Sequence, residues 1–221
     1  MKNDLKVSPA YLTTRCVEFI GSSSPSYLVR GFFFILEGIM DLFTAEDLEG
    51  LLSDLDAELF NSCSDKRYEI YLVGGGALML AWGSRRSTSD LDVVFKNDTE
   101  FIHKCVRGVA SKRGISAGWC NDAVVISTSF TPAIPVYSTL WRSFKCLDVY
   151  TADLELLFCM KLIAGREKDI RDLAYIIEKI NNKGSLVTRR AVASWYKKYY
   201  VDFGKTKKLS ALAKAFLGGL P

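Results

Sequence analysis

Three consecutive glycines, Gly74 to Gly76, most constrain how this chain can fold, because they separate two segments of different pattern. The preceding residues 67–73 (RYEIYLV) are rich in β-branched and aromatic side chains, which predicts a strand. Residues 77–82 (ALMLAW) predict a short helix. Glycine lets a ligand approach the backbone closely, and a helix N-terminus offers unpaired N–H groups to a phosphate. Many strand-to-helix turns are rich in glycine for packing reasons alone, so this turn does not by itself establish a phosphate site.

A pair of aspartates lies on the next predicted strand, residues 89–95 (SDLDVVF). Asp90 and Asp92 are two residues apart, so both carboxylates project from the same face of that strand. Hard oxygen ligands placed side by side are what Mg²⁺ requires. Two such ions, about 4 Å apart, can hold an attacking oxygen and a leaving pyrophosphate on one phosphorus. The alternative is an edge strand that displays two acids to solvent.

The other segments predict an α/β (α+β) fold, with a small mixed β-sheet core between a helical N-terminal flank and a helical C-terminal portion. The expected divisions are residues 1–64, 65–152 and 153–221. Residues 8–62 are expected to be helical, with Thr44 as the N-cap of a helix over 47–60. Two further strands are expected at 122–130 and 145–150. Further helices are expected at 99–113, 154–164, 167–181, 188–200 and 205–216.

Composition excludes several other classes of protein. The six cysteines are scattered without a C-x-x-C pair, which favours free thiols in a reducing compartment over a zinc site or a disulfide framework. Hydrolase schemes that need a histidine would all have to use His103, which lies in a charged stretch of helical pattern. The charged start has no signal-peptide core, and charges interrupt the apolar residues 27–43. We therefore expect a cytoplasmic protein with no membrane partner.

The order of the glycines and the aspartates resembles a known signature. Residues 74–78 (GGGAL) followed by 86–92 (RSTSDLD) look like the motif of the nucleotidyltransferase superfamily with the polymerase-β-like core. A second block, ADLELL at 152–157 and MKLIAGR at 160–166, continues to Asp172 and resembles a later motif. That motif is seen in a bacterial branch that includes the abortive-infection E toxins and their relatives in toxin–antitoxin pairs. The resemblance covers about Tyr68 to Ile180.

The resemblance implies roles for the residues of the first block. Gly74 and Gly75 would lie against the triphosphate of an NTP substrate, and Asp90 and Asp92 would coordinate Mg²⁺, with two ions when the NTP is bound. Arg86 and Thr88 would sit on the loop that leads into the metal strand. Arg86 is expected either to bind a phosphate or to form a structural salt bridge.

The second block adds Lys161, whose counterpart in the related toxins serves the nucleotide phosphates. A lysine in so apolar a helix is expected either to extend to solvent or to face a ligand. Asp169 and Asp172 share one face of the next predicted helix, and one of them could act as a base or hold Lys161 and Arg166 in place. We prefer Asp172 for this role, and we expect Asp169 to belong to a pattern of lysines and aspartates on the protein surface.

Polymerase-β-like enzymes usually carry a third carboxylate on a later strand. Asp148 is the best-placed candidate for this third metal ligand, although alternation could equally point it to solvent. Without it, Asp169 or Asp172 would have to complete the site, or the enzyme would be degenerate.

The acceptor is the least determined part of the prediction. Basic residues and aromatic residues such as Trp195 and Tyr199 alternate near the C-terminus. This pattern suits an RNA end, but also an ordinary amphipathic pair of helices. Three readings remain. The first is transfer of NMP to RNA, such as a tRNA end, by a toxin with a cognate antitoxin. The second is the same chemistry on a protein or small molecule, and the third is a non-catalytic binding module.

Overall fold

The computed structural model describes residues 41–63, 65–84, 87–124, 133–199 and 209–221, which belong to one compact unit, residues 41–221. The helices expected before residue 41 lie outside the described residues. In the described ranges, no helix is both long enough and apolar enough to cross a membrane.

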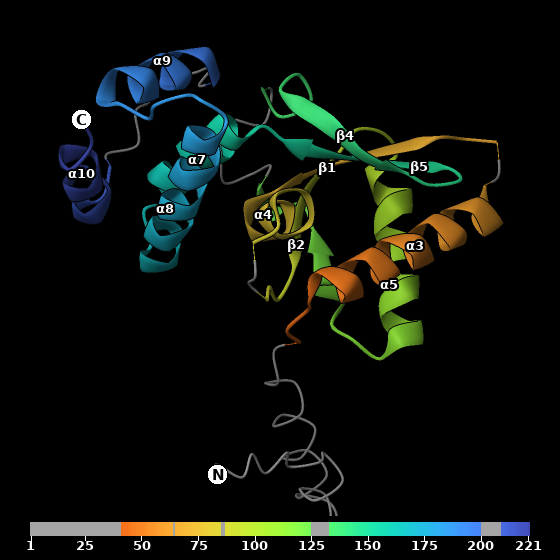
Figure 1. Ribbon diagram of the computed structural model, residues 1–221. Helices are drawn as coiled ribbons and strands as arrows, with labels where there is room; N and C mark the ends of the chain where they lie inside the picture. Colours follow the sequence, from red (N-terminus) through yellow and green to blue (C-terminus); the bar gives the residue numbers. More distant parts are fainter. Residues whose placement is uncertain (1–40, 64, 85–86, 125–132, 200–208) are drawn as a thin grey trace, which may run out of the picture. The chain divides into compact units, whose positions relative to one another are not determined.

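A five-stranded mixed sheet forms the centre of the described chain, in the order β3-β2-β1-β5-β4 (Figure 1). The middle strand β1 runs antiparallel to β2 and parallel to β5. The outer pairings are β3 parallel to β2 and β4 antiparallel to β5. Because β1 is covered on both faces, its apolar run is almost wholly buried. The strands are β1 Tyr68–Val73, β2 Leu91–Phe95, β3 Cys120–Asn121, β4 Ser138–Ser143 and β5 Leu147–Ala152.

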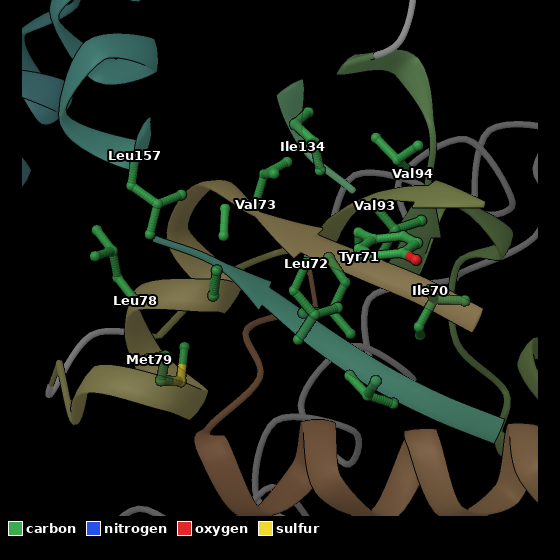
Figure 2. Close-up of a cluster of buried hydrophobic side chains, with 14 of the residues drawn as sticks. Ile70, Tyr71, Leu72, Val73, Leu78, Met79, Val93, Val94, Ile134 and Leu157 are labelled. Atoms are coloured by element: carbon green, nitrogen blue, oxygen red, sulfur yellow. The ribbon is translucent and has the colours of Figure 1, made fainter. Parts of the chain in front are cut away.

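Helices pack around this sheet and on one another. Of the described helices, α3 contacts α5, while α7 contacts α8 and α9 (Figure 1). Leu157 of α7 and Leu78 of α4 belong to the same apolar cluster as Leu72 of β1, which anchors both helices to the sheet (Figure 2). The helices are α3 Ala45–Ser62, α4 Gly74–Trp82, α5 Thr99–Arg113, α7 Leu154–Ala164, α8 Glu167–Asn182, α9 Arg189–Tyr199 and α10 Ala211–Gly218, with a 3-10 turn η1 at Ala117–Trp119.

Helix α3 begins as its sequence predicts. The Thr44 hydroxyl accepts a hydrogen bond from the Asp47 N–H at 3.2 Å, and the Asp47 carboxylate accepts one from the Thr44 N–H at 2.8 Å. This capping box satisfies two backbone donors at the start of the helix. Five leucines at helical spacing then form its buried face: Leu48, Leu51, Leu52, Leu55 and Leu59.

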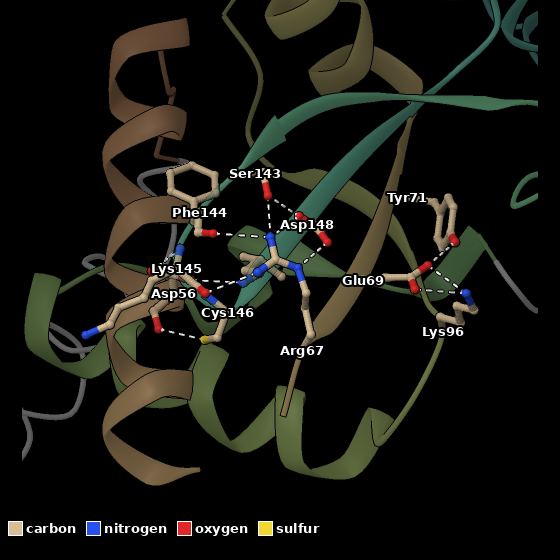
Figure 3. A network of polar contacts seen from close by, with 11 residues as sticks. Asp56, Arg67, Glu69, Tyr71, Lys96, Ser143, Phe144, Lys145, Cys146 and Asp148 are labelled. Atoms are coloured by element: carbon tan, nitrogen blue, oxygen red, sulfur yellow. Dashed lines mark hydrogen bonds and ion pairs between the residues drawn. The ribbon is translucent and has the colours of Figure 1, made fainter. Parts of the chain in front are cut away.

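The same helix holds the turn between β4 and β5 through one buried carboxylate. Asp56 is 8% exposed, and its Oδ1 accepts hydrogen bonds from the N–H groups of Cys146 at 2.8 Å and Leu147 at 2.9 Å (Figure 3). Its Oδ2 accepts a third from the Lys145 N–H at 3.3 Å. Asp56 therefore ties the hairpin, and through it the end of β5, to α3.

One expectation about the strands was wrong, and strand β4 was missed. Residues 122–124 do not begin a strand, because the side chain of Asn121 accepts a hydrogen bond from the Ala123 N–H at 3.2 Å and turns the chain into a helical conformation. Residues 125–130 of that expected strand lie outside the described residues. Strand β4 was not expected at all, since its side chains are half-buried or exposed and show no apolar alternation.

The C-terminal helices differ from expectation mainly at their ends. Helix α10 begins at Ala211, because the Ser210 hydroxyl caps it by accepting a hydrogen bond from the Ala213 N–H at 3.1 Å. Residues 205–208 of the expected helix lie outside the described residues. The helices expected at 99–113 and 154–164 are confirmed with the same bounds.

The network around Asp56 predicts a large effect on stability. In Asp56→Ala, three backbone N–H groups near a buried turn lose their acceptor, so we expect the free energy of unfolding to fall by about 2–4 kcal/mol. Urea denaturation followed by circular dichroism measures this change. Asp54→Ala on the same helix is the matched control, because Asp54 only pairs with Arg113 at the surface. Equal losses in both variants would contradict the assignment.

Candidate functional site

The register between β1 and β2 brings the two sequence motifs together. Asp92 pairs with Val73, the last residue of β1, and α4 begins at the next residue, Gly74. A Cβ added to Gly74 would lie 2.5 Å from Oδ2 of Asp92, and the φ angle of Gly74 is +67°. A side chain at position 74 is therefore excluded both by the backbone conformation and by the carboxylate. The glycine turn and the aspartate strand meet in space.

No side chain caps the first turn of α4. Its N-cap residue, Val73, makes no side-chain hydrogen bond to the helix. A helix N-terminus leaves its first N–H groups without partners inside the helix and carries a partial positive charge. Gly75 has more room than Gly74, because an added Cβ there would meet only the Thr88 hydroxyl at 3.6 Å. The turn can thus present backbone N–H groups next to a carboxylate.

Thr88 positions the loop that leads to Asp90. Its hydroxyl donates to the Asp90 carbonyl oxygen at 3.0 Å, and its backbone exchanges hydrogen bonds with Phe43 at 2.7 and 3.1 Å. The loop is thereby joined to the residue just ahead of α3. Arg86, expected either to bind a phosphate or to form a structural salt bridge, lies outside the described residues.

Asp90 lies just before β2, and its side chain contacts Asn121, a residue that no motif of the sequence indicated. Its Oδ2 accepts a hydrogen bond from the Asn121 amide at 3.3 Å, and its Oδ1 accepts one from the Ser89 hydroxyl at 3.3 Å. Asn121 is the β3 partner of Asp92. Because β3 has two residues, no strand pattern in the sequence indicated that Asn121 would face the aspartate pair.

The surroundings of the Asp92 carboxyl change its pKa. Burial raises the pKa of its carboxyl above the ordinary value, and the nearby charge of Asp90 adds to this. The cations of Lys161, Arg166 and Lys168 act in the opposite direction. A desolvated carboxylate beside a second one is an environment that favours a bound cation.

A cavity of about 430 Å³ opens beside Asp92. Val73, Gly74 and Asp92 line one part of it, and residues from the C-terminal half of α7 line another. The α7 side contributes apolar surface together with Lys161, and Arg166 follows just after the helix. The cavity therefore combines an acidic wall, a helix N-terminus, two cations and apolar surface.

Lys161 does not extend to solvent, which was one of its two expected placements, but lines the cavity, so that its expected role of facing a ligand stays a prediction. It is 7% exposed, and its Nζ lies 3.0 Å from Asp169 Oδ1 and 2.9 Å from Asp172 Oδ2. Asp172 thus holds Lys161 in place, which is one of the two roles expected of it. Asp172 does not appear among the residues that line the cavity.

Asp169 is fully buried, so its expected place in a surface pattern was wrong. Besides Lys161 it contacts Arg166, whose Nε lies 2.6 Å from Asp169 Oδ2. Burial acts to raise the pKa of Asp169, but Arg166 and Lys161 outweigh it, so the net pKa is lowered. The two cations beside the cavity are therefore joined through one ionised carboxylate.

Asp148 does not join the aspartate pair, which corrects its expected role as third metal ligand. It pairs with Glu69 of β1, whereas Asp92 pairs with Val73, four residues further along. That separation is about 13 Å along a strand. The carboxylate of Asp148 instead binds the Arg67 guanidinium, with Nε at 2.5 Å and Nη2 at 2.6 Å (Figure 3). Within the described residues, no group of three or more acids, histidines and cysteines could hold a metal ion.

The aromatic residues of α9 face the protein interior. Trp195 packs edge-on against Phe158, with 5.6 Å between ring centroids. Tyr199 is fully buried and donates a hydrogen bond to Glu155 at 2.7 Å. These two rings serve packing, so of the pattern that suggested an RNA site only the basic residues remain exposed on this helix: Arg189, Arg190, Lys197 and Lys198.

The geometry at Gly74 predicts different outcomes for two neighbouring substitutions. Gly74→Ala forces a side chain into a left-handed conformation and against Asp92, so we expect a loss of about 1–3 kcal/mol in the free energy of unfolding. Gly75→Ala, the matched control, should change it by less than about 1 kcal/mol. Urea denaturation of both variants checks this, and similar losses in the two would refute the close approach of Asp92 to Gly74.

The ion pair of Asp148 predicts an effect of pH. The hydrogen bond from Arg67 lowers the pKa of Asp148, with a smaller contribution from Ser143, while burial opposes both. Since an unfolded aspartate has a pKa of about 3.9, this pair stabilises the fold above about pH 4 and the gain is lost as pH falls through the lower folded value. We expect Asp148→Asn and Arg67→Met each to flatten the fall in urea midpoint between pH 5 and 3. Profiles parallel to that of the wild type would contradict this.

Comparisons with known proteins bear on the same residues. The family described as "Nucleotidyltransferase of unknown function (DUF6036)" matches residues 50–186, which is more than half of the chain and includes the glycine turn, the aspartate pair and Lys161. A search of the curated proteins gives no match. A search of the solved structures gives none either. The abortive-infection branch therefore stays a prediction, whereas the wider superfamily is confirmed: this chain belongs to the DUF6036 family of nucleotidyltransferases of unknown function.

Proposed function

We propose that this protein transfers a nucleoside monophosphate from an NTP to an acceptor hydroxyl and releases pyrophosphate. One observation carries the proposal: the Asp92 carboxylate lies against Gly74 at the uncapped start of α4, beside a cavity that Lys161 and Arg166 also line. Acidic and cationic groups on the walls of one cavity suit a ligand that arrives as a metal–triphosphate complex.

The donor chemistry at the aspartate pair fits Mg²⁺. Asp90 and Asp92 offer carboxylate oxygens, which suit a hard cation, and the amide N–H of their neighbour Asn121 donates to Asp90. The absence of a side chain at Gly74 leaves room for the Asp92 carboxylate at the helix N-terminus. Bound there, Mg²⁺ would neutralise charge on the phosphates and orient the reacting oxygens, with two ions present once the NTP is bound.

The phosphates would meet the other groups of the cavity. Backbone N–H groups of Gly74 and Gly75 suit the non-bridging oxygens of the triphosphate, because they are donors at a positive helix end. Lys161 and Arg166 suit its outer phosphates. Asp172 and Asp169 hold these two cations, so the proposed role of Asp172 is to position Lys161.

The reaction forms one bond and breaks one. The acceptor oxygen bonds to the α-phosphorus, and the bond from that phosphorus to the oxygen bridging to the β-phosphate breaks. Pyrophosphate leaves with the bonding electron pair, and the hydroxyl proton passes to water. No covalent intermediate with the protein is needed, since holding the two reactants in line and stabilising charge account for such transfers.

An RNA end, such as that of a tRNA, is the acceptor that we propose to test first. The exposed Arg189, Arg190 and Lys197 on α9 suit phosphates of a nucleic acid. The half-buried Trp195 and the fully buried Tyr199 are engaged in packing, so on this helix we expect contacts by charge rather than by base recognition. Action as a toxin with a cognate antitoxin stays a prediction from the resemblance.

The decisive experiment supplies each of the four α-labelled NTPs with Mg²⁺ to the purified chain, together with total cellular RNA or total cellular protein. We expect label in the RNA fraction, reduced at least about a hundredfold in Asp92→Asn, because that variant removes a charge from the reacting centre. Asp148→Asn is the matched control, an aspartate exchanged at the other end of the same sheet, and should retain activity at pH 7.

Each outcome decides a different part of the proposal. Label in protein instead of RNA would replace the acceptor and keep the chemistry. Equal labelling by wild type and Asp92→Asn would show that the aspartate pair is not the reacting centre. No label in any fraction, with NTP still bound by the folded protein, would favour a binding role.

A further inference from the structure

A second cavity lies at the far end of the helix that opens the first. Its volume is about 190 Å³, and its walls include Trp82, Leu154 and Ile180. Helix α4 begins at Gly74, which lines the first cavity, and ends at Trp82, which lines the second. A helix of 9 residues is about 13 Å long. A single chain-like ligand is therefore long enough to reach both cavities.

Trp82 and Lys183 meet at the wall of this second cavity. The Lys183 ammonium lies over the half-buried Trp82 ring, 4.1 Å from its centroid. The Trp82 carbonyl accepts a hydrogen bond from the Tyr175 hydroxyl, which joins the end of α4 to α8. The indole N–H of Trp82 is buried without a hydrogen-bond partner among the described residues, although a buried tryptophan usually has one. Packing alone therefore does not account for this tryptophan, and an aromatic ring beside a cation suits a stacked base.

Two acids also line the second cavity, and they differ in how fully their oxygens are used. Glu155 accepts a hydrogen bond from the Tyr199 hydroxyl at 2.7 Å and lies 4.0 Å from the Lys198 ammonium. Asp153 precedes α7, but its side chain does not cap that helix, and one of its oxygens lies 3.5 Å from the Thr139 hydroxyl. A carboxylate can accept several hydrogen bonds, so Asp153 keeps acceptor capacity for an amino group of a ligand.

A row of lysines on α8 connects the two cavities. Lys168, Lys179 and Lys183 are eleven and four residues apart, a spacing that places them along one edge of the helix. The charge of Lys168 reaches Asp92 in the first cavity, whereas Lys183 lines the second. Positive charges between two cavities suit the phosphates of a single strand that passes from one to the other.

We propose that the second cavity binds one unstacked base of the RNA acceptor, a few nucleotides from the end that reacts, and that it selects a base with an amino group. This inference rests on the proposed function and deepens it by stating how the acceptor is held. Trp82 stacks on the base, Asp153 accepts a hydrogen bond from its amino group, and the lysines of α8 contact the neighbouring phosphates. Cytosine carries such an amino group and uracil does not, so these two pyrimidines distinguish hydrogen bonding from stacking.

The first test needs neither a variant nor catalysis. Fluorescence anisotropy measures how tightly the purified chain binds single-stranded RNA probes of about ten nucleotides, all cytidine or all uridine, without NTP or divalent metal. We expect the cytidine probe to bind about tenfold more tightly, because the Asp153 carboxylate needs an amino group as its donor. Equal affinities for the two probes, or no binding of either by the folded protein, would overturn the inference.

Substitutions then separate the two contacts with the base. Asp153→Ala should bind both probes equally, with about the affinity of the wild type for uridine. Trp82→Leu should weaken binding of both probes about tenfold, whereas Trp82→Phe, which keeps a ring, should retain most of the affinity. Trp141→Leu is the matched control, because the Arg142 guanidinium lies 4.7 Å from the centroid of that ring and Trp141 lines neither cavity. Thermal unfolding checks that each variant is folded.

The dependence of binding on salt tests the row of lysines. For a single strand, the slope of log K against log salt concentration changes by about 0.7 for each phosphate contact. The double variant Lys179→Ala/Lys183→Ala should therefore reduce the slope by about 1.4. Lys145→Ala is the control, since the Lys145 ammonium also lies over an aromatic ring, that of Phe60, but at the turn between β4 and β5. A slope that is equally changed in both variants would overturn the path along α8.

The outcomes keep this inference apart from the proposed function. Because binding is measured without NTP, equal effects of Trp82→Leu and Trp141→Leu would overturn the second cavity as a base site and leave nucleotide transfer standing. Conversely, labelling of RNA by Asp92→Asn at the rate of the wild type would overturn the reacting centre. A cytidine preference that Asp92→Asn shares with the wild type would still support the base site.

Discussion

The backbone hydrogen bonds between β1 and β2 set Asp92 opposite Val73, and the arrangement of the candidate site follows from that register. Side chains on a strand alternate between the two faces, so a shift of one residue would move Asp92 to the other face of the sheet. The register also sets Asp92 beside Val73, the last residue of β1, and α4 begins at the next residue, Gly74. The carboxylate consequently meets a helix N-terminus, and position 74 admits only glycine without strain.

Much of the fold could be predicted because local patterns and the final packing agree. Helix α3 has a capping residue and leucines at helical spacing, and α7 is apolar enough to be identified from sequence although it is buried on nearly all sides. Strand β4 could not be predicted in this way. It lies at an edge of the described sheet with its side chains largely exposed, so its conformation comes from pairing with β5, which the sequence of β4 alone does not reveal.

The candidate site, like the fold, could be predicted only in part. The glycines and the aspartate pair are close in sequence, and the resemblance of their order to the nucleotidyltransferase signature predicted that they would form one site. Lys161 was identified, and a contact with Asp169 or Asp172 was one of the expected alternatives. The sequence did not show that both acids hold Lys161, because this depends on how α8 packs against α7 rather than on spacing within one helix. Asp148 was misplaced because alternation along a strand gives the face of a side chain and not its position along the neighbouring strand. Asn121 was missed because a two-residue strand has no periodicity.

The buried ion pairs of Lys161 have a consequence for the thermodynamics of ligand binding. A lysine free in solvent loses up to about 2 kcal/mol of rotamer entropy when a ligand immobilises it. Lys161 is already immobilised by Asp169 and Asp172 when the protein folds, so that entropic loss belongs to folding and not to the arrival of a ligand. The same carboxylates already balance much of its charge, so its remaining attraction for an anion is smaller than that of an unpaired lysine. The ion pairs therefore fix the shape of the cavity before a ligand binds, at the expense of its affinity for an anionic ligand.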